Sequence, residues 1–151
     1  MKRLYILIAA LVIIAIACNK DKFTTVPQLK LKSISPNTVV TNDIITLEGS
    51  YTDQEGDLDS ILVVYKWFNG ATVIFPFDTL RYSFEGLNAP KKTKEADINL
   101  QFQYNNSDPN GYAKLSGVNR DTTAAFGMVL KDEAGNRSEY KESEKIRIKK
   151  P

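Results

Sequence analysis

Four carboxylates fall within seven residues of the sequence, with no lysine or arginine between them: Asp53, Glu55, Asp57 and Asp59. Like charges at this density repel one another unless solvent or a cation neutralises them. Ca²⁺ takes six to eight oxygen ligands, and Gly56 would let the chain curl around such an ion. The spacing differs from an EF-hand, because Val64 stands where the closing glutamate would be. The run predicts a calcium site, and the alternative is a solvated acidic turn in which Asp53 or Asp57 caps backbone amides.

A single cysteine, Cys18, stands where a short uncharged segment ends and polar residues begin. A start with Lys2 and Arg3, an uncharged stretch over residues 4–17 and small residues before the cysteine are typical of a signal peptide. The uncharged stretch is too short for a membrane-spanning helix, which needs about 20 apolar residues. The pattern therefore predicts a targeting segment over residues 1–17.

Residues 15–18, Ala-Ile-Ala-Cys, resemble the lipobox of bacterial lipoproteins, with Ala15 where leucine is commonest. The resemblance implies that residues 1–17 are removed, that the thiol of Cys18 carries a lipid which anchors the protein to the membrane, and that residues 18–27 form a flexible tether. Asn19, in place of aspartate, implies the outer membrane, facing the periplasm or the cell surface. Two alternatives stay open: an uncleaved membrane anchor, and a secretory signal with Cys18 as a free thiol.

Histidine is absent from the 151 residues, and Cys18 is the only cysteine. The sequence therefore excludes serine and cysteine catalysis that depends on histidine, and it excludes zinc, haem or iron-sulfur sites built on histidine or several cysteines. The chain has 20 basic and 18 acidic residues, and without Lys2 and Arg3 both numbers are 18, so we expect no nucleic-acid partner. We expect no enzymatic activity. A glycan-acting hydrolase is the weakest alternative, because its two carboxylates must face each other across a cleft.

Apolar and polar residues alternate through most of the chain after residue 27, and this period of two predicts β-strands. Turn residues separate the apolar segments, and Asn69-Gly70 predicts a tight hairpin. No helical pattern of ten or more residues follows Cys18. We expect an all-β fold, an antiparallel β-sandwich of seven or eight strands over residues 28–151. The expected strands are centred on residues 29–31, 45–51, 61–67, 73–77, 80–84, 98–104, 124–130 and 146–148.

Two stretches resemble parts of bacterial immunoglobulin-like domains of the PKD and cadherin-like kind. Residues 36–59 are similar to the B strand and B–C loop, residues 130–138 are similar to the F–G loop, and Trp67 stands near the position of the strand C tryptophan. The resemblance implies an immunoglobulin-like sandwich in which both loops lie at the same end. Asp132 and Asn136 could then complete the calcium shell, with a structural role and an affinity on the order of 10⁻⁴ to 10⁻³ M.

Most aromatic residues of the middle of the chain fall in phase on strand faces and are expected in the core: Trp67, Phe75, Phe77, Tyr82 and Phe84. The alternative for this set is a platform on which sugar rings stack. Phe68 and Ile74 are out of phase with their neighbours, which predicts an exposed apolar contact. The sequence as a whole predicts a lipid-anchored binding or scaffolding module of the outer membrane, stabilised by calcium. Its partner is a protein or a glycan that the sequence does not identify. The alternative is a purely structural accessory subunit of an envelope complex.

Overall fold

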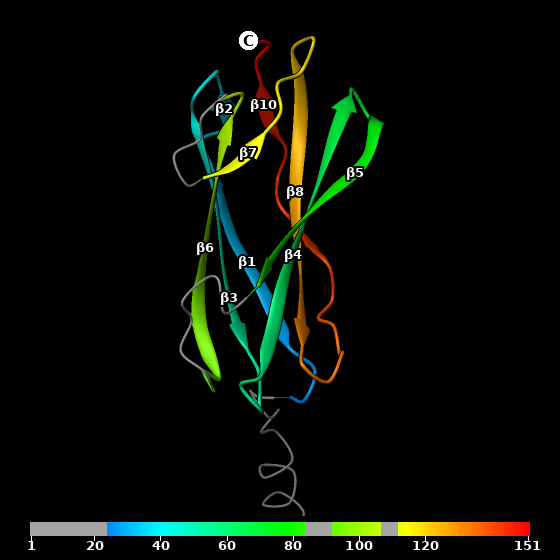
Figure 1. The fold of residues 1–151 in the computed structure, drawn as a ribbon. Coiled ribbons are helices and arrows are strands. Elements are labelled where there is room, and N and C mark those ends of the chain that lie inside the picture. Colours follow the sequence, from blue (N-terminus) through cyan, green and yellow to red (C-terminus); the bar gives the residue numbers. More distant parts are fainter. Residues whose placement is uncertain (1–23, 84–91, 107–111) are drawn as a thin grey trace, which may run out of the picture.

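The computed structural model describes residues 24–83, 92–106 and 112–151, and side chains are not described for residues 73–83. The residues predicted as a signal peptide, and Cys18 with them, lie outside these ranges. The described part is all β, with ten strands (Figure 1): β1 (Gln28–Ser35), β2 (Thr38–Val39), β3 (Ile44–Thr52), β4 (Leu58–Asn69), β5 (Thr72–Ser83), β6 (Glu95–Tyr104), β7 (Ala113–Leu115), β8 (Thr122–Asp132), β9 (Lys141–Glu142) and β10 (Ile146–Ile148).

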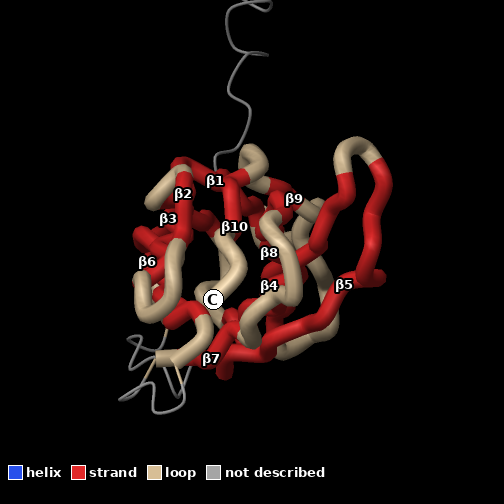
Figure 2. The backbone as a smooth tube through the Cα atoms, turned by 90° about the horizontal axis from the view of Figure 1, so that it is seen from above, coloured by secondary structure: helices blue, strands red, loops and turns tan. Residues whose placement is uncertain are grey.

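The strands form two sheets that pack face to face. One sheet has the order β1-β3-β6-β7, and the other has the order β2-β10-β8-β4-β5, with β9 paired to β8. Seen from above in Figure 2, β3 and β6 lie on one side of the molecule and β4 and β8 on the other. The predicted β-sandwich is therefore confirmed.

The core lies between the sheets and follows from the period-two pattern. Alternate residues of β6 are buried, including Phe102 and Tyr104, and the polar residues between them face outwards. Phe102 stacks on Phe126 of β8, with ring centroids 5.8 Å apart, so the two sheets meet through aromatic contact. The buried Tyr104 hydroxyl accepts the Val118 N–H and donates to the Lys149 carbonyl, which satisfies its polar group.

The strand pattern differs from the prediction in three ways. Both sheets are mixed, because β6 pairs with β7 and β10 pairs with β2 in parallel. Residues 73–77 and 80–84 were expected as two strands, but a single strand, β5, runs from Thr72 to Ser83 opposite β4. The short strands β2, β7 and β9 were not predicted, whereas β10, which also has only three residues, was indicated by Ile146 and Ile148 on either side of Arg147.

The predicted exposure of Phe68 is wrong. Its side chain is only 7% exposed, because the Lys145 ammonium lies 3.8 Å from the centroid of its ring. Trp67 is half-buried and packs against the core, as expected. The side chains of Phe75, Phe77, Tyr82, Phe84 and Ile74 lie outside the described part of the structure. None of the described residues belongs to a helix that is long and apolar enough to cross a bilayer.

Candidate metal centre

The acidic run forms the connection between β3 and β4 at one end of the sandwich. β3 ends at Thr52 and β4 begins at Leu58, so Asp53, Glu55 and Asp57 all lie in the turn between them. Gly56 has φ +68, and a Cβ there would lie 2.7 Å from the Lys92 carbonyl carbon. Only glycine combines this conformation with so close an approach to a neighbouring backbone, and the chain therefore curls tightly enough to bring the carboxylates together.

Three carboxylates converge in this turn. One oxygen from each of Asp53, Glu55 and Asp57 lies within 4.8 Å of the others. Asp53 is fully buried, at 0% exposure, Asp57 is half-buried and Glu55 is exposed. Among the described residues no lysine or arginine forms an ion pair with any of the three. The cluster, which we call the acidic turn, thus runs from the interior to solvent without a basic partner.

The hydrogen bonds of the acidic turn leave two buried oxygens without a partner. Asp53 Oδ2 accepts the Asp57 backbone N–H at 3.0 Å, which is the capping contact expected of a plain acidic turn. Asp53 Oδ1 and Asp57 Oδ1, however, are buried and have no hydrogen-bond partner. A buried carboxylate oxygen is costly unless it is paired with a donor or a cation. Capping therefore accounts for one oxygen of the acidic turn, and a bound cation would account for the other two.

The β8–β9 connection meets the acidic turn, which is the arrangement of loops that the resemblance to immunoglobulin-like domains implied. The Glu133 N–H donates to the Asp57 carbonyl at 3.0 Å, and Leu58 pairs with Asp132 across the β4–β8 ladder. Asp132 is 1% exposed, and both of its carboxylate oxygens accept hydrogen bonds from Asn136, from the backbone N–H at 2.7 Å and from Nδ2 at 2.8 Å. The Asn136 amide therefore orients the Asp132 carboxylate beside the turn.

The electrostatics of the site reflect this crowding of negative charge. Burial raises the pKa of Asp57 above its ordinary value, and the charges of Asp53 and Asp132 raise it further. Burial and the Asp53 charge also raise the pKa of the Tyr51 hydroxyl. The negative charges of Asp53 and Asp132 thus act together on Asp57, and a cation beside Asp57 would be stabilised by both.

Asp59 lies apart from the three gathered carboxylates. It stands on β4, where its Oδ2 pairs with Lys131 Nζ at 3.4 Å and accepts the Ser60 hydroxyl at 3.0 Å. Of the six residues that the sequence suggested as calcium ligands, the structure gathers Asp53, Glu55 and Asp57, places Asp132 and Asn136 beside them, and gives Asp59 a basic partner.

Backbone contacts around the acidic turn gave no sequence signal. The Gln54 N–H donates to the Thr24 carbonyl at 3.2 Å, and the Asp53 N–H donates to the Lys94 carbonyl at 2.8 Å. Such contacts depend on the course of the chain and not on side-chain type. The turn consequently connects the residues before β1, those before β6 and those after β8.

The donors fit a hard cation. Carboxylate oxygens suit Ca²⁺ and Mg²⁺, whereas copper and iron-sulfur sites call for imidazole or thiolate ligands. Ca²⁺ tolerates irregular geometry and a variable number of ligands, and a turn that combines one buried, one half-buried and one exposed carboxylate matches that tolerance better than the strict octahedron of Mg²⁺.

No protein-family model matches the sequence, and no curated protein matches it either. Among solved structures, the sporulation control protein Spo0M from Bacillus subtilis is similar to this chain, with 8% sequence identity and a TM-score of 0.43. The match covers 85% of this chain and 51% of the Spo0M chain, so this chain spans about half the length of Spo0M. A CARDB domain of the PF1109 protein from Pyrococcus furiosus, in complex with di-metal ions, is similar with 14% sequence identity and a TM-score of 0.28. This match covers 86% of the present chain and 93% of the CARDB chain. Both TM-scores lie below 0.5, so neither likeness extends to function.

Proposed function

We propose that this chain is a lipid-anchored β-sandwich module of the bacterial outer membrane that binds or scaffolds a protein or glycan partner, has no catalytic activity and is stabilised by Ca²⁺ in the acidic turn. The observation that carries the calcium site is the pair of buried oxygens without partners, Asp53 Oδ1 and Asp57 Oδ1. The lipobox resemblance of residues 15–18 supports the anchor.

The composition and the shape of the site support a non-catalytic role. The chain has no histidine, and the described carboxylates that gather do so in one turn and not across a cleft. A cation held there would connect the acidic turn to the neighbouring β8–β9 connection through Asp132. Calcium would thereby stabilise one end of the sandwich, which is a structural role.

Thermal unfolding of residues 19–151, which contain every described strand, tests the calcium site. For an affinity on the order of 10⁻⁴ to 10⁻³ M, 10 mM Ca²⁺ should stabilise the folded state by about 1.4 to 2.7 kcal/mol relative to chelator. For a domain of this size the midpoint should rise by roughly 5 to 10 °C. Mg²⁺ at the same concentration should raise the midpoint less.

Two matched variants locate the effect. Asp53→Asn should abolish the calcium-dependent rise in midpoint, because it removes the most buried charge of the cluster. Asp59→Asn removes the same charge from the same stretch of sequence but from a carboxylate paired with Lys131, and it should keep the rise. An unchanged midpoint in the parent protein, or an equal loss in both variants, would refute calcium binding at the acidic turn.

A further inference from the structure

The chain enters the sandwich beside the acidic turn through residues 24–27, which we call the entry segment. Figure 1 places the start of β1 and the β3–β4 turn at the same end of the molecule. Residues 24–26 are exposed, and within the entry segment only Pro27 is buried. Little buried apolar surface therefore holds the entry segment in place, and its position depends on a few polar contacts.

One hydrogen bond joins the entry segment to the acidic turn. The Gln54 N–H donates to the Thr24 carbonyl at 3.2 Å. The other hydrogen bonds of the segment are local: Gln28 Nε2 donates to Thr24 Oγ1 at 3.0 Å and to the Val26 carbonyl at 2.9 Å, and Thr24 Oγ1 donates to the Val26 carbonyl at 2.6 Å. Among the described residues, only the hydrogen bond from Gln54 ties residues 24–26 to a part of the chain beyond Gln28.

The residue that donates this hydrogen bond stands between two of the proposed calcium ligands. Gln54 lies between Asp53 and Glu55 in the sequence, and these two carboxylates each place an oxygen within 4.8 Å of the other and of an Asp57 oxygen. The Asp53 side chain is 0% exposed, and its Oδ1 has no hydrogen-bond partner. A cation that binds both carboxylates fixes the direction of the Gln54 N–H between them. Calcium would therefore position the donor that holds Thr24.

Without a cation, the same carboxylates act against this hydrogen bond. Three negative charges within 4.8 Å repel one another, and among the described residues no lysine or arginine pairs with them. The repulsion is relieved when Glu55, the exposed member of the three, moves outwards into solvent. Gln54 directly precedes Glu55, so this movement turns the Gln54 N–H away from Thr24 and frees the entry segment.

We propose that Ca²⁺ in the acidic turn holds the entry segment against the sandwich and that removal of Ca²⁺ releases it. This inference rests on the calcium site and the lipid anchor proposed above, and it adds a regulatory role to the calcium. Thr24 lies six residues after Cys18, and Gln28 lies ten residues after it. A fully extended chain therefore spans about 20 Å from Cys18 to the first held residue with calcium and about 35 Å without it. Calcium thereby sets how closely the sandwich is tied to its anchor.

Hydrogen exchange of the Gln54 amide, measured by NMR on the ¹⁵N-labelled full chain in non-ionic detergent, tests the proposal. In 10 mM Ca²⁺ this amide should exchange at least tenfold more slowly than in chelator. The ¹⁵N order parameters of residues 24–26 should rise from below about 0.6 in chelator to about 0.8 with calcium. Asp53→Asn should remove both effects, whereas Asp59→Asn should keep them, because Asp59 pairs with Lys131.

A second pair of variants separates the entry segment from the calcium site. Gln28→Ala removes the side chain that braces Thr24 and Val26. It should keep the calcium-dependent rise in unfolding midpoint, but calcium should slow exchange of its Gln54 amide several-fold less than in the parent protein. Gln101→Ala is the matched control, because it removes an exposed glutamine from β6, and it should behave like the parent protein in both measurements.

The outcomes distinguish this inference from the calcium site itself. A midpoint that rises with calcium, while the Gln54 amide and residues 24–26 do not change, would overturn the inference and leave the calcium site standing. A Gln54 amide that exchanges equally slowly in chelator would also overturn it, since the entry segment would then be held without calcium. Equal effects of Gln28→Ala and Gln101→Ala would do the same. No rise in midpoint and no change at the entry segment would refute the calcium site and this inference together.

Discussion

At the residue scale, the charge on Asp57 has opposite effects with and without calcium. Burial and the charges of Asp53 and Asp132 already disfavour its ionised form. In chelator, Asp57→Asn should therefore raise the free energy of unfolding by about 1 kcal/mol, because the repulsion disappears and the new amide can donate a hydrogen bond to a neighbouring carboxylate. In millimolar calcium the same variant should be less stable than the parent protein, because a ligand is lost.

Chemical unfolding in both conditions measures this change of sign. Asp59→Asn is again the control, since it loses an ion pair with Lys131 and should be slightly destabilised in both conditions. If Asp57→Asn were destabilised to the same degree with and without calcium, the carboxylate would serve the fold alone and the cation site would be refuted.

Individual site residues differed in how far the sequence could predict them. Asp53, Glu55 and Asp57 are adjacent along the chain, so their charge density was visible without a fold. Asp132 could be included only through the expected topology of two loops at one end. The burial of Phe68 could not be predicted, because the group that covers it, Lys145, comes from a distant part of the chain just before β10.

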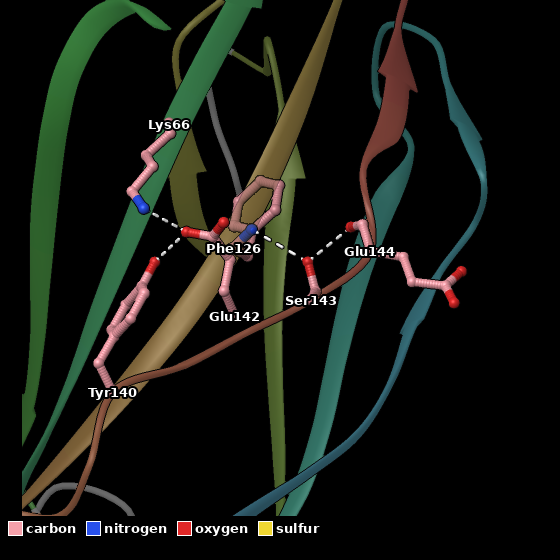
Figure 3. A network of polar contacts seen from close by, with 6 residues as sticks. All are labelled: Lys66, Phe126, Tyr140, Glu142, Ser143 and Glu144. Atoms are coloured by element: carbon pink, nitrogen blue, oxygen red, sulfur yellow. Dashed lines mark hydrogen bonds and ion pairs between the residues drawn. The ribbon is translucent and has the colours of Figure 1, made fainter. Parts of the chain in front are cut away.

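At the element scale, polar contacts hold the β9 segment against β8 and β4 (Figure 3). Glu142 pairs with Lys66 of β4 and accepts a hydrogen bond from the Tyr140 hydroxyl. On the other side of β9, the Ser143 hydroxyl accepts the Phe126 N–H at 3.1 Å and donates to the Glu144 carbonyl at 2.8 Å. A strand of two residues is thus held in place by side chains in addition to its own ladder.

The pH dependence of stability should reveal the Glu142 contacts. Burial alone would raise the pKa of Glu142, but the hydrogen bonds from Lys66 and Tyr140 outweigh it, and the pKa is lowered. A lowered carboxylate pKa contributes stability above the ordinary pKa of the group, and this is lost as pH falls through the folded-state value. Glu142→Gln should therefore lower the free energy of unfolding by about 0.5 to 1 kcal/mol near neutral pH, which is what an exposed ion pair contributes. At about pH 2 the variant and the parent protein should have the same free energy of unfolding.

Unfolding in urea across this pH range measures the effect. Glu144→Gln is the matched control two residues further on, since its side chain points away from the contacts in Figure 3, and it should follow the parent protein at every pH. A constant difference between Glu142→Gln and the parent from neutral to acid pH would mean that the Glu142 charge contributes nothing.

Elements with a clear local pattern were predictable. The alternation over residues 98–104 correctly indicated β6, and Asn69-Gly70 correctly indicated the β4–β5 hairpin, where Gly70 has φ +61. β9 could not be predicted, because its position depends on contacts with Lys66 of β4 and Phe126 of β8. The parallel pairing of β7 with β6 likewise has no local pattern in the sequence.

At the scale of the whole molecule, the acidic turn lies at one end of the long strands. β4 begins beside the acidic turn, and its 12 residues span roughly 40 Å to the β4–β5 hairpin at the other end. This length is several times the screening length of about 8 Å at physiological salt. The charge of the acidic turn therefore does not reach the far end of the sandwich.

The position of the expected tether orients the domain relative to a membrane. The Thr24 carbonyl accepts the Gln54 N–H of the acidic turn, so the chain enters the sandwich at the acidic end. If Cys18 carries a lipid, the acidic turn faces the bilayer and the β4–β5 hairpin faces away from it. The full chain produced in a Gram-negative host should then incorporate labelled fatty acid and sediment with membranes.

Cys18→Ser separates the anchor from the fold in this experiment. The variant should lose the fatty-acid label and the membrane association, because two or more acyl chains are what hold such a protein stably on a bilayer. The domain should keep its unfolding midpoint, since Cys18 precedes every described strand. A labelled Cys18→Ser protein would refute lipidation at this residue.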